Sequence, residues 1–217
     1  MCGRFTLTRR DGREIAELLG IDPREFRDHL PRYNVAPTQH HYLVTTEYEN
    51  RRVTLAKWGL VNSWAKDASR AAQQINAKAE TIETRGAFKD AFHQRRCVIP
   101  ADGFYEWEAV GPKEKQPHYF YSPEGLFSLA GVWKQTPEGL AFSIFTTTPN
   151  ELVGRFHNRM PVILGHNAVA QWLAPDTDKE TLTGLMHSFP ADLMSGHRVS
   201  KAVNSPRNNS ASCIEPV

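Results

Sequence analysis

The chain has 217 residues, of which 40% are hydrophobic and 23% are charged, and its formal net charge is +2 at pH 7. A chain of this length can bury a sizeable core, and so mild a charge does not by itself indicate a nucleic-acid-binding protein. No apolar stretch approaches the ~20 residues of a membrane-spanning helix, and the N-terminus lacks the apolar segment of a signal peptide, so we expect a cytoplasmic protein without a membrane partner.

The first predicted element is a helix near the N-terminus. Thr8 can cap a helix that runs through Leu19, and Gly20 can end it. The other predicted elements follow from helical or alternating apolar patterns. In chain order they are strands at residues 42–46 and 52–58, a helix at 83–94, strands at 96–99, 104–107, 118–121, 126–133, 140–147 and 162–164, and helices at 166–173 and 179–188.

Strands outnumber helices in this pattern, and short polar turns join them. The pattern predicts an α+β fold with a mostly antiparallel, curled or barrel-like sheet as its core and helices on its flanks. We expect a single domain over residues 1–217, with a C-terminal tail at 204–217. Residues 204–212 are the only stretch whose composition suggests a loose segment.

The three cysteines, Cys2, Cys97 and Cys213, are scattered along the chain. No Cys-x-x-Cys pair or Cys/His cluster has the spacing of zinc ligands, so we expect neither a metal nor another cofactor. Cys97 lies in an apolar run and is expected in the core, whereas Cys213 lies in the polar tail without an evident partner.

Cys2 differs from the other two because of its position. Initiator methionine is normally removed before a small second residue, and the chain would then begin with an α-amine and a thiol on one residue. The α-amine has a pKa of ~7.7–8.0, against ~10.4 for lysine, so much more of it is neutral near pH 7.5. Such an amine can condense with an aldehyde to an imine, and the thiol can close onto the imine carbon to form a thiazolidine. Taken alone, Cys2 fits better as a small residue near a frayed end, and the sequence that follows it is what favours the chemical role.

A series of short blocks follows along the chain. They are residues 1–5 (MCGRF), 32–38 (RYNVAPT), 58–61 (WGLV) with Trp64, 75–81 (INAKAET), 96–107 (RCVIPADGFYEW), 146–148 (TTT), 157–161 (HNRMP) and 199–204 (VSKAVN). In this order the blocks resemble those of the SOS response-associated peptidase (SRAP) family, the abasic-site-processing proteins. The resemblance implies that the chain traps the ring-opened sugar aldehyde of an abasic site in single-stranded DNA as a thiazolidine.

The resemblance also implies catalytic roles beside Cys2. Asn76 would hold the N-terminal amine or the backbone beside it, and His157 would act near the sugar oxygen to help the ring open. Glu106 would move protons, because a carboxyl group in an aromatic run tends toward a raised pKa. Its strand neighbours Tyr105 and Trp107 would point to the opposite face. Without the resemblance, these residues fit a turn-capping asparagine, a structural histidine and a solvated carboxylate at a sheet edge.

The DNA-binding residues implied by the resemblance are of two kinds. Arg4, Lys78 and Arg159 would contact phosphates, and Pro37 and Trp64 would wedge or stack where bases are unstacked. Taken singly, the cations fit ordinary solvated charges and Trp64 fits a core residue.

Two positions depart from the family pattern. Lys78 stands where the family usually has arginine, so the charge is kept but the bidentate fork toward phosphate is lost. Ala65 stands where some members carry a second tryptophan, which reduces the stacking surface beside Trp64.

Three functions remain open from the sequence. The first is a covalent abasic-site protein, with possible strand cleavage through the same imine. The second is a hydrolase that uses Cys2 as an N-terminal nucleophile, on its own Met1 bond or on another amide. The third is a non-catalytic binder of damaged DNA. We expect a monomer in each case.

Overall fold

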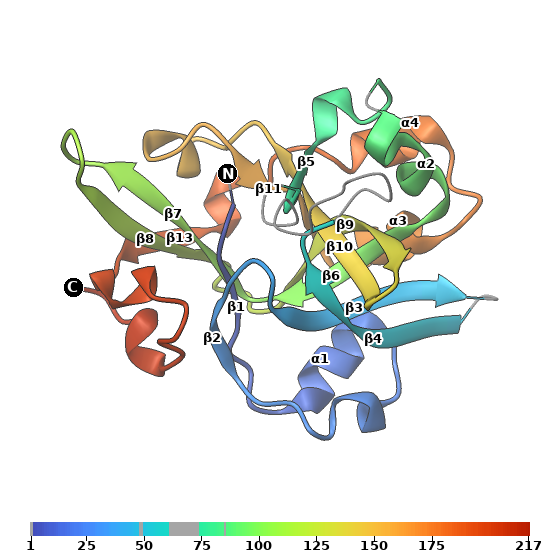
Figure 1. The fold of residues 1–217 in the computed structure, drawn as a ribbon, viewed down its shortest axis with the longest axis horizontal. Helices are drawn as coiled ribbons and strands as arrows, with labels where there is room; N and C mark the ends of the chain where they lie inside the picture. Colours follow the sequence, from blue (N-terminus) through green and yellow to red (C-terminus); the bar gives the residue numbers. More distant parts are fainter. Residues whose placement is uncertain (1, 48–49, 61–73, 85) are drawn as a thin grey trace.

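The larger of two sheets closes on itself (Figure 1). Its ring consists of β3 (His40–Glu47), β4 (Asn50–Trp58), β6 (Arg96–Ala101), β9 (Phe127–Thr136) and β10 (Gly139–Thr147). The pairings run β10–β4–β3–β6–β9 and return to β10, and all are antiparallel except the parallel β10–β4 pair. Such closure leaves no free edge in the ring. The prediction of an α+β fold with a mostly antiparallel, barrel-like core is confirmed.

Three short strands extend this sheet. β5 (Asn76–Lys78) pairs in parallel with β10, β11 (Met160–Pro161) pairs with β10, and β12 (Ile163–Leu164) pairs with β9. The structure describes residues 2–47, 50–60, 74–84 and 86–217.

The second sheet has the strand order β13–β8–β7–β1–β2. Its strands are β1 (Phe5–Leu7), β2 (Arg32–Val35), β7 (Gly103–Ala109), β8 (Lys115–Tyr121) and β13 (Ser195–Arg198). β7 and β8 form a hairpin that projects away from the barrel, and β1 lies between this hairpin and the barrel (Figure 1).

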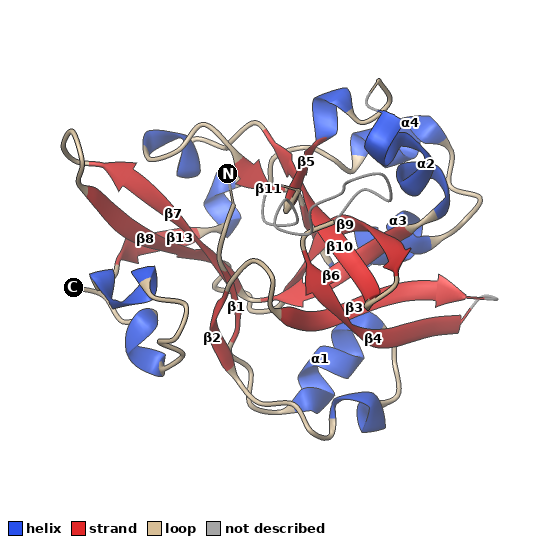
Figure 2. Cartoon of the chain, in the orientation of Figure 1, coloured by secondary structure: helices blue, strands red, loops and turns tan. Residues whose placement is uncertain are grey.

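Helices lie outside the strands (Figure 2). α1 (Gly12–Leu19), α2 (Gly86–Gln94), α3 (His166–Leu173) and α4 (Lys179–Gly184) are α-helical. None of the helices in the described ranges combines the length and the apolar character needed to span a membrane. Single turns of 3-10 helix occur at Pro23–Phe26, Ala79–Thr81, Val153–Arg155, Ala191–Leu193, Lys201–Asn204 and Ala211–Cys213.

Alternation along the barrel strands separates two apolar clusters, as expected when successive side chains point to opposite faces. On β6, Val98 packs with residues of the flanking helices, whereas Cys97 and Ile99 pack in the second cluster. Cys97 is therefore a core residue, as its apolar run predicts. The second cluster also contains Cys2, Phe5 and Phe104, so it joins the barrel core to the second sheet.

Two sequence expectations are wrong, one about the start of α1 and one about residues 204–212. α1 is capped by Asp11, whose side chain accepts from Arg13 N at 2.9 Å, and not by Thr8. Thr8 instead donates its amide and hydroxyl to Asp102, at 2.5 and 2.7 Å. The end of the helix is as predicted: Gly20 adopts the left-handed conformation, with φ 60°.

The second error concerns residues 204–212, which are docked and not loose. Asn34 Nδ2 on β2 donates to the carbonyl oxygens of Val203, Ser205 and Asn208, at 3.1, 3.0 and 2.8 Å. Cys213 beyond them is fully buried. A polar segment can be held this way because its backbone groups, which the composition does not reveal, find partners on the sheet.

Candidate functional site

Pairing between β1 and β7 determines where Cys2 lies. Phe5 is registered with Phe104, and Tyr105 N donates to Arg4 O at 3.0 Å. The strands are antiparallel, so the residues before Phe5 run along β7 toward Glu106. This pairing brings the N-terminal cysteine next to a carboxyl group about a hundred residues away.

Cys2 is completely buried, and its Sγ lies 3.8 Å from Arg4 O. Burial raises the pKa of the thiol strongly, and the negative charge of Glu106 raises it further. The thiol is therefore protonated in this arrangement, and it needs a proton acceptor before or during nucleophilic attack.

Asn76 holds the backbone of Cys2. Its Nδ2 donates to Cys2 O at 2.8 Å, from a strand that the parallel pairing with β10 fixes in place. Its Oδ1 is buried and accepts no hydrogen bond from any residue that the structure describes. An amide oxygen in this position suits an N–H donor, such as the amine of a chain that begins at Cys2.

Glu106 has 2% of its surface exposed. Burial raises the pKa of its carboxyl group from 4.5 to about 7, and the charge of Lys115 offsets part of the rise. Its strand neighbours Tyr105 and Trp107 pack in a separate cluster on the other face of β7, as the strand alternation predicts. A carboxyl group with a pKa near neutrality can both donate and accept a proton at physiological pH.

His157 faces this carboxyl group. Its Nδ1 lies 3.7 Å from Glu106 Oε2, 3.0 Å from Arg159 O and 3.1 Å from Arg159 N. Partial burial lowers the pKa of the ring below its ordinary value, and the nearby charge of Lys115 acts in the same direction. A largely neutral imidazole follows, which can give or take a proton at its other nitrogen.

A cleft of about 510 Å³ opens over Glu106 and His157. Its remaining walls come from Arg4, Trp107 and Asn204 on one side and from Lys113 and Lys115 of the β7–β8 hairpin. The two lysines were not among the predicted site residues. The sequence feature that could have indicated them is the lysine-rich segment after the GFYEW block, because a hairpin at this segment brings its lysines back toward Glu106.

The three cations predicted to contact phosphate differ in whether other groups of the protein already bind their charges. Arg4 Nη1 donates to Asn34 Oδ1 and Val203 O, at 2.9 and 2.6 Å, and Arg159 forms a bidentate ion pair with Glu80, at 2.7 and 2.9 Å. Lys78, by contrast, is exposed at the end of β5. Lys78 is therefore the cation of the three whose charge is presented to solvent.

Of the predicted stacking residues, Pro37 is partly exposed and Trp64 lies outside the described residues, as does its neighbour Ala65. Pro37 occupies a tight turn closed by Gln39 N and Ala36 O at 3.2 Å, and the following Thr38 has φ 71°. Glycine usually takes that conformation, so the backbone is strained where the proline is displayed.

The described residues bring no three His, Cys, Asp or Glu side chains into an arrangement that would hold a metal ion. The side chains of Cys2, Glu106 and His157 bring a thiol, a carboxyl group and an imidazole to this region.

Comparison with known proteins gives relatives over the whole length. The chain is 41% identical over 225 residues to the abasic site processing protein YoqW of Bacillus subtilis, with 99% of each chain covered. It is 30% identical to the abasic site processing protein YedK of Escherichia coli, with 100% of each covered. It is 31% identical to the abasic site processing protein HMCES of Pongo abelii, over 89% of this chain and 68% of that one.

Solved structures share the fold. A protein from Bacteroides thetaiotaomicron superposes with a TM-score of 0.84 at 23% identity over 100% of both chains. A phage-related protein from Bordetella bronchiseptica gives 0.73 at 27% identity, over 92% of this chain and 95% of that one. The model of the family described as SOS response associated peptidase (SRAP) matches residues 1–206, and the chain, with its N-terminal cysteine beside a buried glutamate, belongs to that family.

Proposed function

We propose that this protein processes abasic sites in single-stranded DNA by forming a covalent thiazolidine between Cys2 and the sugar aldehyde after Met1 is removed. The observation that carries the proposal is one cluster of contacts: Asn76 holds the backbone of the buried Cys2, the charge of Glu106 acts on the Cys2 thiol, and Glu106 and His157 line an open cleft. Three relatives named abasic site processing protein support the substrate class.

The first step concerns the sugar. An abasic sugar is mostly a closed hemiacetal, and the aldehyde appears only when the ring oxygen is protonated and the hydroxyl at C1′ loses its proton. His157, which faces the cleft with a largely neutral ring, is placed to move these protons.

The second step joins the protein to the sugar. The neutral α-amine of Cys2 adds to the aldehyde carbon, Glu106 protonates the departing hydroxyl, and water leaves to give an imine. The Cys2 sulfur then bonds to the imine carbon while its proton passes, through the Glu106 carboxylate, to the imine nitrogen. The product equals protein plus DNA less one water. Because the thiol pKa is raised by burial, this step depends on a nearby base.

The same imine permits a minor strand cleavage. Loss of a proton from C2′ of the imine expels the 3′ phosphate by β-elimination. Ring closure by the thiol competes with this path, because the thiazolidine carbon is no longer an electron acceptor.

An intact-mass measurement tests the proposal. After incubation with single-stranded abasic DNA, the adduct should weigh as much as the protein without Met1 plus the oligonucleotide, less 18 Da for one water. The band on a denaturing gel should survive heating. An unshifted mass, with the protein folded and free of Met1, contradicts the proposal. An oligonucleotide with an ordinary base at the same position is the control.

The second candidate is a hydrolase in which Cys2 is an N-terminal nucleophile, and the family's description as a peptidase favours it. It predicts turnover of an amide without a stable DNA adduct, so the gel separates the two candidates.

A further inference from the structure

His118, which is buried, and Glu108, which is partly exposed, form a polar pair next to the proposed site. His118 Nε2 lies 2.9 Å from Glu108 Oε2, and the two side chains are 5% and 30% exposed. Arg198 on β13 approaches the same Glu108 oxygen at 4.0 Å. None of the three was singled out by the sequence blocks, and no step of the proposed chemistry uses them.

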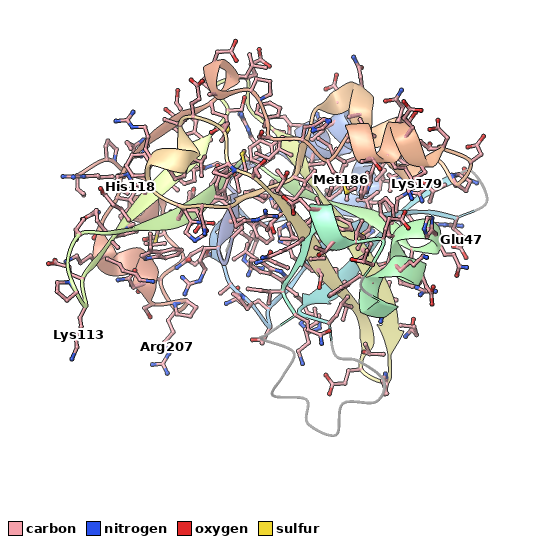
Figure 3. The ribbon with its side chains drawn as sticks, turned by 90° about the horizontal axis from the view of Figure 1, so that it is seen from above. Glu47, Lys113, His118, Lys179, Met186 and Arg207 are labelled. Carbon is pink, nitrogen blue, oxygen red and sulfur yellow. The ribbon has the colours of Figure 1, made fainter. Side chains whose placement is uncertain are left out.

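Sheet register places this pair beside Glu106. On the β7–β8 hairpin Glu106 is the cross-strand partner of His118, which in turn is the partner of Arg198 on β13. Directly opposed residues share a face of the sheet, with Cβ atoms roughly 5 Å apart. In Figure 3, His118 lies toward the body of the molecule, whereas Lys113 projects from the far end of the same hairpin.

The ring of His118 packs on the segment that carries His157. The ring centroids of His118 and Phe156 are 4.1 Å apart, with an angle of 33° between the planes, and Phe156 immediately precedes His157. Arg155 Cζ lies 5.5 Å from the centroid of the Phe156 ring. The backbone amides of Phe156 and His157 both donate to Val153 O, at 2.9 and 3.0 Å, so the segment is a single tight turn.

These contacts connect the ring of His118 to the turn that carries His157. Its turn is short, and the side chain that precedes it rests on the His118 ring. Glu108 fixes that ring by a hydrogen bond, which a phenyl ring of similar size would lack. A shift of the ring would move Phe156, and with it the distance between His157 and the substrate.

We propose that His118, held by Glu108, is a positioning residue for His157, and that it acts through the ring of Phe156. The proposal rests on the proposed function, because it assigns His157 to opening of the sugar ring. It predicts a selective defect: the ring-opening step should suffer, and the later joining of the aldehyde to Cys2 should not.

Two oligonucleotides test this selectivity. One carries a natural abasic site, and the other carries an aldehyde on an acyclic linker that cannot close to a hemiacetal. Single-turnover crosslinking is measured with both at saturating DNA, well below the melting temperature of each variant. In His118→Ala the ratio of the natural to the acyclic rate should fall about tenfold or more, since small misplacements of a reacting group are costly.

Glu108→Ala is the second variant, and it decides the matter if His118→Ala does not fold. It leaves the ring of His118 in place but removes its anchor, so the ratio should fall in the same direction by a smaller factor. Glu114→Gln is the matched control. It removes a carboxylate charge from the same hairpin, where Glu114 pairs with Lys201 at 2.5 Å in solvent, and it should leave the ratio unchanged.

The outcomes are distinguishable. A lowered melting temperature with an unchanged ratio in the folded variants means that the pair is merely structural, and it overturns the positioning role while the proposed function stands. Absence of any Cys2 adduct in the wild-type protein, with either oligonucleotide, overturns the proposed function and the positioning role together.

Discussion

Arg96 and Glu106 come from the same sequence block, and both are buried, yet their surroundings are opposite in kind. The Arg96 guanidinium, on β6, donates to four carbonyl oxygens, those of Phe92, His93, Trp172 and Ala174, at 2.6 to 3.0 Å. Glu106, on β7, faces an imidazole across 3.7 Å at the floor of an open cleft.

The two residues differ in how firmly their charges are held. Hydrogen bonds with backbone carbonyls at the ends of α2 and α3 hold the charge of Arg96 in place, and this charge cannot change its partners without moving both helices. The raised pKa of Glu106 puts its two protonation states close in free energy near neutral pH. Burial with fixed partners stabilises the fold, whereas burial that leaves the proton exchangeable supports chemistry.

The largest expected effect comes from replacing Cys2, the residue whose thiol Glu106 adjoins. Cys2→Ala should abolish the heat-stable adduct with abasic DNA, because no thiol remains to close the ring. The α-amine of the mature chain remains, so a reversible imine should still be trapped by borohydride. Gel analysis with and without borohydride measures both species, and an untreated, heat-stable adduct in Cys2→Ala would contradict the thiazolidine.

The next largest expected effect is a loss of stability on replacing Arg96. Arg96→Met should lower the free energy of unfolding by roughly 3–5 kcal/mol, because four buried carbonyls lose their donor. Denaturant titration measures the loss. The folded fraction should crosslink at the wild-type rate, and a slower rate at full folding would show that Arg96 also influences the site.

The sequence predicts the long elements of this fold better than its short ones. β9 and β10 have long alternating runs and were expected within a few residues, and α3 was expected with the observed bounds. β1 and β5 were missed because strands of three residues are defined by their partners and not by their own pattern. The false cap at Thr8 has the same origin, since its partner Asp102 is distant in the sequence.

The sequence could name the residues of the candidate site, but it could predict their arrangement only in part. The blocks named Cys2, Asn76, Glu106 and His157, and the structure places these four residues together. Local sequence could not show that the guanidinium of Arg4 donates a hydrogen bond to Val203 O in the C-terminal segment. That contact depends on the packing of this segment against β1 and β2.

Glu106→Gln should have two effects of intermediate size. Glutamine keeps the size of the side chain but cannot shuttle a proton, so crosslinking near pH 7 should slow by about tenfold or more, and β-elimination should decline with it. Single-turnover rates at saturating DNA measure this. A wild-type rate across the pH range would remove Glu106 from the mechanism and leave Cys2 with its own amine.

The second effect of Glu106→Gln is on stability, and its sign follows from the raised pKa. The folded carboxyl group titrates near pH 7 and the unfolded one near 4.5, so the folded state binds more protons between these values. The contribution of Glu106 to stability should therefore fall as the pH rises from 4.5 to 7, by up to about 3 kcal/mol. Glu106→Gln should lack this contribution, so the stability of the wild type relative to this variant should decline over the same pH range. A difference in free energy of unfolding between the wild type and Glu106→Gln that is the same at pH 4 and at pH 8 would contradict the raised pKa.

The smallest expected effect is on DNA binding at the surface. Lys78 and Arg159 differ there, as Glu106 and Arg96 do in the interior, in how firmly their charges are held. Lys78 is exposed on β5, whereas the guanidinium of Arg159 is held by Glu80 and by Thr146 O at 2.5 Å. A contact with phosphate releases counterions, and each one contributes about one unit to the slope of log affinity against log salt. Lys78→Ala should therefore flatten the slope for single-stranded DNA by about one unit, with little change in melting temperature.

Arg159→Ala should behave differently, because its loss frees Glu80 and disturbs the turn whose backbone meets His157 Nδ1. We expect a lower melting temperature and a slower crosslinking rate, with a smaller change of salt slope than in Lys78→Ala. Fluorescence anisotropy over a range of salt, with an oligonucleotide that carries a reduced and unreactive abasic site, measures binding apart from chemistry. Glu80→Gln is the informative companion. If Arg159 serves mainly to hold this turn, removing its partner should reproduce the slower rate while leaving the cation available to phosphate. If Arg159 instead binds DNA directly, Arg159→Ala should flatten the slope as much as Lys78→Ala does, and Glu80→Gln should tighten binding.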